Sequence, residues 1–211
     1  MRLGRISSLT PLSTIFGFDR GTPIDRVYIE AFLASHASDI RGRVLEVGDD
    51  SYSRRFGGDR ITGQDILNID PRDPLATIVG DLADPETLPA DRFDCIIMTQ
   101  TLQLVFDVRS AIEHIRRSLR PGGVLLMTVP AIGPLCADQW QESFYWSFTP
   151  NSVARLLGES FEASKVEVAS LGNLYAATAF LHGAAVEEVK TRKLEPTNPG
   201  YAITIAARAV A

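Results

Sequence analysis

Val44-Leu45-Glu46-Val47-Gly48 is a short apolar segment that closes on a carboxylate and a glycine, and it begins a series of predicted buried strands. The later predicted strands of this series cover residues 61–65, 76–81, 93–98 and 123–129. Strands buried on both faces of a parallel sheet have unbroken apolar sequences of this kind, separated by helical or turn sequences. This alternation predicts an α/β fold with right-handed crossovers and a parallel sheet.

Acidic residues recur where the predicted strands end. Glu46, Asp65 and Asp81 each lie at or near the end of a strand. Ligands of open α/β sheets bind beyond the carboxyl ends of the strands. The sequence therefore predicts a pocket at this rim for a ligand rich in hydroxyl and amino groups, as a nucleoside is.

Composition limits the class of protein. The chain has 211 residues, 45% hydrophobic and 22% charged, which is typical of one globular domain with an appendage. Its net charge of -5 argues against a nucleic-acid partner, because phosphate binding normally requires a basic surface. No segment resembles a signal peptide or a membrane span, so we expect a cytoplasmic protein without a membrane partner. Cys95 and Cys136 have no second cysteine or histidine at metal-ligand spacing, and no metal site is predicted.

Predicted helices cover and extend the strand series. A helix is expected to begin near Pro23, and two more are expected at residues 107–119 and 150–157. Strands at 165–169 and 202–207 are expected to close the sheet, with an apolar helical insertion at 174–190 between them. The insertion would shape either a substrate cavity or a homodimer surface, and the sequence favours neither.

Six short pieces in this order resemble the class I S-adenosylmethionine-dependent methyltransferases, in particular a methyltransferase type 11-like subgroup with a compact first crossover and a Tyr-Trp-x-Phe-Thr segment. They are Val44–Gly48, Asp81–Leu82, Arg92–Ile97, Gln100–Leu102, Leu119–Gly123 and Tyr145–Thr149. The resemblance implies a Rossmann-like, doubly wound, mostly parallel seven-stranded sheet with an antiparallel last strand. It implies a single domain over 1–211, in which 1–40 form an N-terminal segment and covering helix, 43–158 the cofactor-binding core, and 159–211 the closing strands.

The resemblance also implies S-adenosylmethionine as the cofactor. Gly48 would let the ligand approach the backbone, and Glu46 would accept a hydrogen bond from the ligand's ammonium group, directly or through water. Asp81 and the backbone N–H of Leu82 would contact the adenine. Glu46 and Asp81 have a structural alternative, which is to cap neighbouring helices.

The ribose and the methionine part would be bound by two further strand ends. A carboxylate that ends the second strand would accept both ribose hydroxyls. We assign this role to Asp65, with Asp70 as the alternative because the strand could extend beyond Asp65. The backbone of Thr99 and Gln100 would line the methionine part.

The chain departs from the family in two features, the glycine-rich loop after the first strand and the general base. Only Gly48 remains of the usual glycine-rich loop, and Asp49-Asp50-Ser51 follows it, which implies weak cofactor binding or a loop that directs both carboxylates outward. Gln103, Tyr145 and Trp146 are the candidate catalytic residues, expected to face the acceptor, yet the sequence shows no evident general base. The alternative role of the aromatic residues at 144–148 is to seal the core.

The functional hypothesis is methyl transfer to a small molecule or a sugar unit, with oxygen as the expected acceptor atom. Its first rival is a catalytically inactive methyltransferase-like domain that serves as a binding or scaffolding partner. A nicotinamide dinucleotide site is disfavoured, because the first turn lacks the repeated glycines that a pyrophosphate requires.

Overall fold

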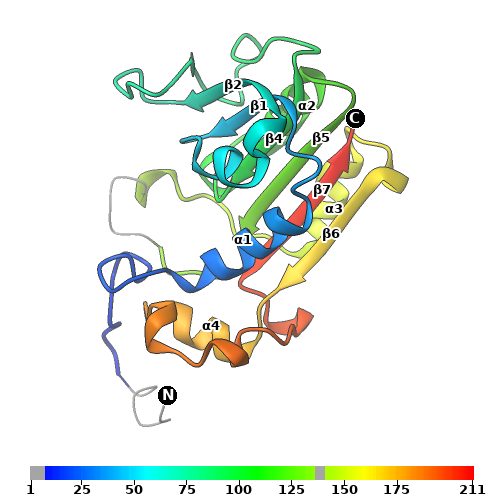
Figure 1. The fold of residues 1–211 in the computed structure, drawn as a ribbon. Helices are drawn as coiled ribbons and strands as arrows, with labels where there is room; N and C mark the ends of the chain where they lie inside the picture. Colours follow the sequence, from blue (N-terminus) through cyan, green and yellow to red (C-terminus); the bar gives the residue numbers. More distant parts are fainter. Residues whose placement is uncertain (1–7, 136–140) are drawn as a thin grey trace.

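The computed structural model describes residues 8–135 and 141–211, which contain one seven-stranded sheet (Figure 1). The strands are β1 (Gly42–Val47), β2 (Ile61–Asn68), β3 (Ile78–Val79), β4 (Phe93–Thr99), β5 (Leu119–Pro130), β6 (Val166–Leu171) and β7 (Thr204–Val210). Their order is β3-β2-β1-β4-β5-β7-β6. Strand β7 is antiparallel to both β5 and β6, whereas β1 to β5 pair in parallel. The predicted Rossmann-like sheet with an antiparallel last strand is confirmed.

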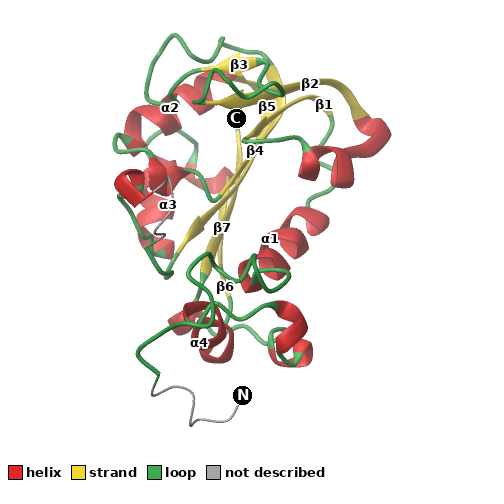
Figure 2. Cartoon of the chain, turned by 90° about the vertical axis from the view of Figure 1, so that its left-hand side faces the viewer, coloured by secondary structure: helices red, strands yellow, loops and turns green. Residues whose placement is uncertain are grey.

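Helices lie on both faces of the sheet. They are α1 (Ile24–Ser35), α2 (Val108–Ser118), α3 (Pro150–Gly158) and α4 (Leu174–Leu181). Figure 2 shows the sheet nearly edge-on, with α2 and α3 on one side, α1 on the other, and α4 below α1. No helix in the described ranges has the length and apolar character needed to cross a bilayer.

Side chains cap the first turns of two of the predicted helices. The side chain of Asp107 accepts a hydrogen bond from the Ser110 N–H at the start of α2. Thr149 and Ser152 form a reciprocal capping box at the start of α3. These contacts satisfy N–H groups that lack a partner in the first helical turn, so both helices begin where the sequence predicts.

The sheet is buried between two apolar layers. On the α1 face, Ile29 and Leu33 pack against Val44 and Ile97 of the sheet. On the opposite face, the side chains of α2 and α3 pack in a larger cluster that includes Phe93. Cys95 is fully buried, as expected of a small core residue. The strands are therefore held rigidly, and their carboxyl ends form a fixed rim.

Strand β2 is longer than the sequence predicts. It continues through Ile66 and Leu67 to Asn68, and these residues pair in register with β1 and β3. Because Ile66 and Leu67 are buried apolar residues, the strand gains hydrophobic contacts by continuing past Asp65. The prediction that β2 ends at Asp65 is wrong.

The insertion between β6 and β7 is only partly a regular helix. Helix α4 ends at Leu181, and Gly183 adopts a positive φ of 68° close to the backbone of Ser13. The rest of the insertion consists of short 3-10 turns and loops. Phe180 of α4 packs with Ile24 and Tyr28 of α1, so the insertion is anchored beside the start of α1.

Candidate functional site

A cavity of about 450 Å³ lies beyond the carboxyl ends of β1, β2 and β4. Its volume is in the range of small-molecule sites. The strand ends and the loops that follow them contribute Val47, Gly48, Leu67, Asn68, Ile69, Gly80, Asp81, Leu82, Thr99, Gln100, Thr101 and Gln103. The location agrees with the predicted rim.

Gly48 lies where β1 turns into the following loop. Its φ of 99° is strained for residues with a side chain, and its N–H donates to the carbonyl of Leu67 at 2.9 Å. A Cβ built on Gly48 would meet nothing within 4 Å. The backbone conformation therefore selects glycine here, and the space beside it is open to a ligand.

The adenine residues predicted from the resemblance also line the cavity. Asp81 is exposed, and its side chain accepts a hydrogen bond from the Ala83 N–H, which fixes the turn. Leu82 is buried, and its carbonyl contacts the ring of His114. Asp81 thus shapes its own turn and still borders the cavity.

Glu46 does not line the cavity, although it was expected to contact the cofactor. Glu46 is 3% exposed, and its carboxylate accepts hydrogen bonds from the N–H groups of Tyr52 at 3.1 Å and Ser53 at 2.7 Å. Burial raises the pKa of Glu46 to about 7, although these hydrogen bonds favour the charged form. In the structure Glu46 holds the loop after β1, which is the capping alternative.

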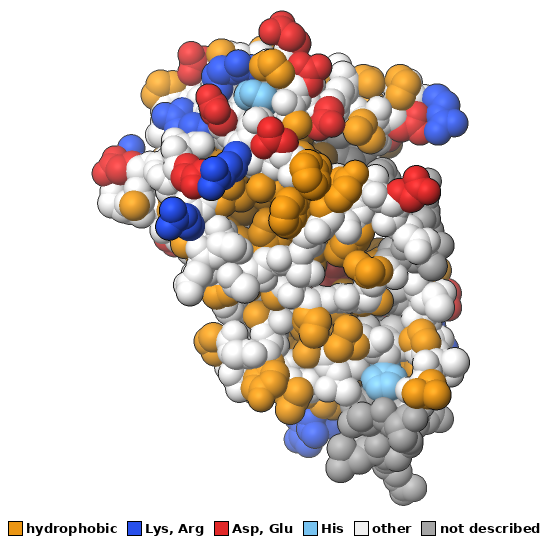
Figure 3. All heavy atoms as spheres, turned by 180° about the vertical axis from the view of Figure 1, so that it is seen from behind, with side chains coloured by type: hydrophobic (Ala, Val, Ile, Leu, Met, Phe, Trp, Pro, Cys, Tyr) orange, Lys and Arg blue, Asp and Glu red, His pale blue; other side chains and the backbone are white. Residues whose placement is uncertain are grey.

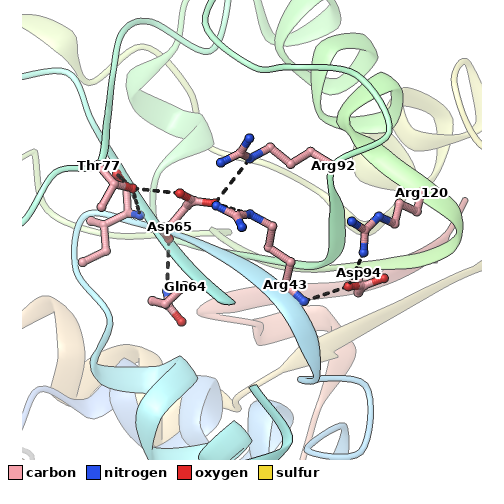
Figure 4. Close-up of polar contacts among 8 residues, drawn as sticks. Arg43, Gln64, Asp65, Thr77, Arg92, Asp94 and Arg120 are labelled. Atoms are coloured by element: carbon pink, nitrogen blue, oxygen red, sulfur yellow. Dashed lines mark hydrogen bonds and ion pairs between the residues drawn. The ribbon is translucent and has the colours of Figure 1, made fainter. Parts of the chain in front are cut away.

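Asp65 lies inside β2 and does not line the cavity, and Figure 4 shows its polar contacts. Its carboxylate binds Arg43 at 2.7 Å, Thr77 at 3.2 Å and Arg92 at 3.5 Å. Burial raises the pKa of this carboxyl, but the hydrogen bond and charge of Arg43, with Arg92, outweigh burial and keep the pKa below its usual value. The four residues expected to converge are thus divided, because Gly48 and Asp81 line the cavity while Glu46 and Asp65 do not.

Asp70, the alternative to Asp65, is also outside the cavity wall. It forms an ion pair with Arg72 at 2.7 Å on the surface. The residue at the true end of β2 that borders the cavity is Asn68. The apolar pair that precedes Asn68 was the signal that the strand continues.

The loop after Gly48 directs its two acidic residues away from the cavity. Asp49 accepts a hydrogen bond from the Ser51 N–H, and Asp50 pairs with Arg54 at 2.6 Å. Neither carboxylate lines the cavity. Of the two interpretations of this loop, the structure agrees with outward-facing carboxylates.

Only one of the three candidate catalytic residues lines the cavity. Gln103 is buried in its wall, whereas Tyr145 and Trp146 are 48% and 37% exposed and lie outside it. The Trp146 Nε1–H donates to the Val105 carbonyl at 3.1 Å, and both aromatic rings contact Phe106. Hydrophobic side chains gather beside a hollow near the middle of the face shown in Figure 3. Ser143 and Phe144 of the same segment border the cavity instead.

Two charged residues in the cavity wall were not among the residues predicted from the sequence. Asp25 and Arg26 lie in the first turn of α1 and both border the cavity. The Arg26 guanidinium lies 5.6 Å from the centre of the Phe18 ring, and its Nη1 donates to the Tyr52 hydroxyl at 3.4 Å. The helix itself was expected, but the apolar periodicity that predicts it does not show which polar residues face a ligand.

No metal centre is evident where side chains are described, because no group of three or more His, Cys, Asp or Glu residues is placed to hold an ion. The expectation of a metal-free site therefore stays a prediction for the whole chain.

A family model described as a methyltransferase domain matches residues 25–163. Among solved structures, the N-methyltransferase NodS from Bradyrhizobium japonicum WM9 with S-adenosyl-l-homocysteine is 15% identical, has a TM-score of 0.58 and covers 98% of this chain and 94% of its own. An S-adenosylmethionine-dependent methyltransferase from Archaeoglobus fulgidus is 10% identical, with a TM-score of 0.60 and coverage of 88% and 94%. A Haloferax volcanii methyltransferase structure, a complex with the Trm112 activator, is 19% identical, with a TM-score of 0.57 and coverage of 89% and 92%. No curated protein sequence matches the chain.

Proposed function

The chain belongs to the class I S-adenosylmethionine-dependent methyltransferases, and we propose that it methylates a small molecule in the cavity beyond β1, β2 and β4. The observation that carries the proposal is the continuous wall that joins the strand ends to the start of α1. One part of this wall suits an adenosyl group, and the other is apolar. A cofactor and an acceptor would therefore meet in one cavity.

The strand-end part of the wall fits the adenosyl group. Gly48 leaves open space at the backbone, Asp81 and Leu82 border the position proposed for adenine, and Thr99 borders the proposed methionine part. We propose Asn68 in place of Asp65 as the residue that contacts the ribose, since it occupies the end of β2. Glu46 would act indirectly by holding the loop.

Arg26 would bind the carboxylate of the methionine part. In the family this end of the cofactor passes the glycine-rich loop, which here keeps only Gly48. Arg26 borders the cavity and reaches Tyr52 of that loop. A guanidinium forms strong charge-assisted hydrogen bonds with a carboxylate, so Arg26 compensates for the missing glycines.

The acceptor would bind against the apolar part of the wall, which the N-terminal segment, the loop after β5 and α4 provide. Phe16, Phe18, Phe144 and Phe180 border this part. A sugar unit requires many polar partners, so these side chains favour an apolar small molecule over the sugar expected as an alternative. Phe180 belongs to the insertion between β6 and β7, and this supports the proposal that the insertion shapes the cavity. The alternative, that the insertion forms a homodimer surface, stays a prediction.

The chemistry needs positioning more than acid-base help. When bound, S-adenosylmethionine supplies a methyl group already activated by its sulfonium. The residues of the wall would hold the acceptor in line and exclude water. Oxygen, expected from the sequence, and nitrogen are both candidate acceptor atoms. NodS is an N-methyltransferase, but its 15% identity extends the likeness to the fold alone.

Calorimetry with S-adenosylmethionine, S-adenosylhomocysteine and NAD tests the proposal. We expect micromolar binding of the first two and none of NAD. If protein with a folded circular dichroism spectrum binds neither of the first two, the proposed function is overturned in favour of the scaffolding alternative.

A further inference from the structure

Two buried acceptor atoms in the cavity wall have no hydrogen-bond partner among the described residues. They are Oδ1 of Asp25 and Oε1 of Gln103. Asp25 is 8% exposed and Gln103 is 5% exposed. Leaving a buried polar atom unpaired costs about 1–3 kcal/mol, and more for a charged group. Such atoms at a cavity wall indicate a ligand that supplies the missing partners.

The contact of one amide atom of Gln103 shows whether the unpaired atom is the oxygen or the nitrogen. The Nε2 of Gln103 donates to the carbonyl of Gln100 at 2.7 Å. A carbonyl can only accept, so the nitrogen must face it and the unpaired atom must be the oxygen. Both unpaired atoms, one on Asp25 and one on Gln103, therefore require a donor.

Asp25 places a buried carboxyl group beside Arg26 in the cavity wall. Burial raises its pKa, and the charge of Arg26 together with the backbone N–H groups of Arg26 and Asp25 offsets this only in part. Its place in the first turn of α1 favours a negative charge, but the helix N-terminus does not supply a partner for Oδ1. A cationic donor would satisfy both the hydrogen bond and the charge, whereas a hydroxyl would satisfy only the first.

The residues before Asp25 anchor the start of α1 to the acceptor part of the cavity, whereas Arg26 after it is assigned to the cofactor. Pro23 pairs with Ala185 of the insertion, and Ile24 packs beside Phe180. Phe16 stacks on Phe180 with ring centres 6.0 Å apart. Asp25 is thus carried by a turn anchored to the aromatic wall, where an apolar acceptor body would lie.

We propose that the acceptor is an apolar amine whose ammonium group binds Asp25, with Gln103 as a second hydrogen-bond acceptor in the same wall. This rests on the proposed function and makes nitrogen, in place of oxygen, the methylated atom. Asp25 takes one proton from the ammonium group, which frees the nitrogen lone pair. The N–C bond then forms as the sulfonium C–S bond breaks, and the electron pair of that bond returns to sulfur.

A matched pair of probes tests the inference without any variant. 2-Phenylethylamine and 2-phenylethanol have the same apolar body and differ in the group that would meet Asp25. Calorimetry on the protein saturated with S-adenosylhomocysteine should show that the amine binds about tenfold more tightly or better. Mass spectrometry with S-adenosylmethionine should show an N-methylated product.

The variant Asp25→Asn separates the acceptor site from the cofactor site. It should reduce the amine preference to about threefold or less while S-adenosylhomocysteine still binds with unchanged affinity. Gln103→Leu, which removes the second acceptor together with the hydrogen bond to the Gln100 carbonyl, should weaken amine binding less than Asp25→Asn. It provides a second variant in case Asp25→Asn fails to fold.

Three results would overturn the inference. The first is binding of the alcohol that equals or exceeds that of the amine, and the second is no binding of the amine to the S-adenosylhomocysteine complex. The third is a loss of S-adenosylhomocysteine affinity in folded Asp25→Asn, which would assign Asp25 to the cofactor's own ammonium group. All three leave the proposed function standing. Failure of the wild-type protein to bind S-adenosylhomocysteine would overturn both.

Discussion

Arg43 and Asp65 form an ion pair between adjacent strands, with Arg43 Nε 2.7 Å from Asp65 Oδ2. The Arg43 backbone N–H also donates to Asp94, and Asp94 pairs with Arg120 of β5 (Figure 4). Charged side chains thus connect β2, β1, β4 and β5. Asp65, which was expected to bind the ribose, instead has structural partners. Its removal should therefore change the stability of the fold and not the affinity for the cofactor.

Asp65→Ala should destabilise the fold and leave the cofactor site intact. The substitution leaves the guanidinium of Arg43 without its buried partner, for which we expect a loss of about 2–3 kcal/mol in the free energy of unfolding. Urea denaturation measures this loss, and calorimetry with S-adenosylhomocysteine on the folded variant should show unchanged affinity. Asp70→Ala, which removes an exposed ion pair, is the control and should change stability little. A tenfold loss of affinity with unchanged stability would restore Asp65 to the ribose site.

Asn68→Ala should weaken cofactor binding, because Asn68 stands at the end of β2 and borders the cavity. Loss of one or two hydrogen bonds to the ribose corresponds to an increase of about tenfold in the dissociation constant. The control ligand is methionine, which keeps the carboxylate proposed to bind Arg26 but lacks the ribose, and its affinity should be the same for the variant and the wild type. If Asp70→Ala weakens S-adenosylhomocysteine binding more than Asn68→Ala does, the assignment of the ribose residue is wrong.

Arg26→Ala should weaken binding of S-adenosylhomocysteine about tenfold or more, because it removes the charged partner of the cofactor's carboxylate. 5′-Methylthioadenosine has the adenosyl group without that carboxylate, so its affinity should be the same for the variant and the wild type. Calorimetry with the two ligands measures the difference. Equal losses for both ligands would indicate that Arg26 supports the fold of the site and does not bind the carboxylate.

The fold could be predicted from the sequence, because the central strands β1, β4 and β5 each contain a buried apolar run. The position of a strand's last residue could not be predicted equally well. Ile66 and Leu67 pair with β1 beyond Asp65, and this pairing moves the cavity residue from Asp65 to Asn68. A carboxylate that follows an apolar run can point to a ligand or to an arginine on the next strand, and only the pairing register distinguishes them.

The sequence indicated residues that border the cavity where backbone geometry selects the residue, and missed such residues where side-chain direction does. Gly48 has a positive φ that a strand-to-loop turn requires, and a glycine after an apolar strand indicates such a turn. Asp25 and Arg26 instead lie on a helix, where the direction of each side chain depends on how the helix packs. Tyr145 and Trp146 show the opposite error, because aromatic residues near a site were expected to face the acceptor but pack on Phe106.

Glu46 should make the stability of the protein depend on pH. Its pKa is raised from 4.5 to about 7, chiefly by burial, so the native state holds more protons than the unfolded state between these values. The free energy of unfolding therefore falls by about 3 kcal/mol at most as the pH rises through this window. The stabilising contribution of Glu46 is fully present below the unfolded-state pKa of 4.5. Glu46→Gln, which stays neutral and can still accept one N–H hydrogen bond, should show a flatter profile in urea denaturation between these two pH values. Glu86→Gln, at an exposed carboxyl, is the control and should keep the wild-type slope. A wild-type slope in Glu46→Gln would mean that Glu46 is ionised throughout and that its two N–H partners outweigh its burial.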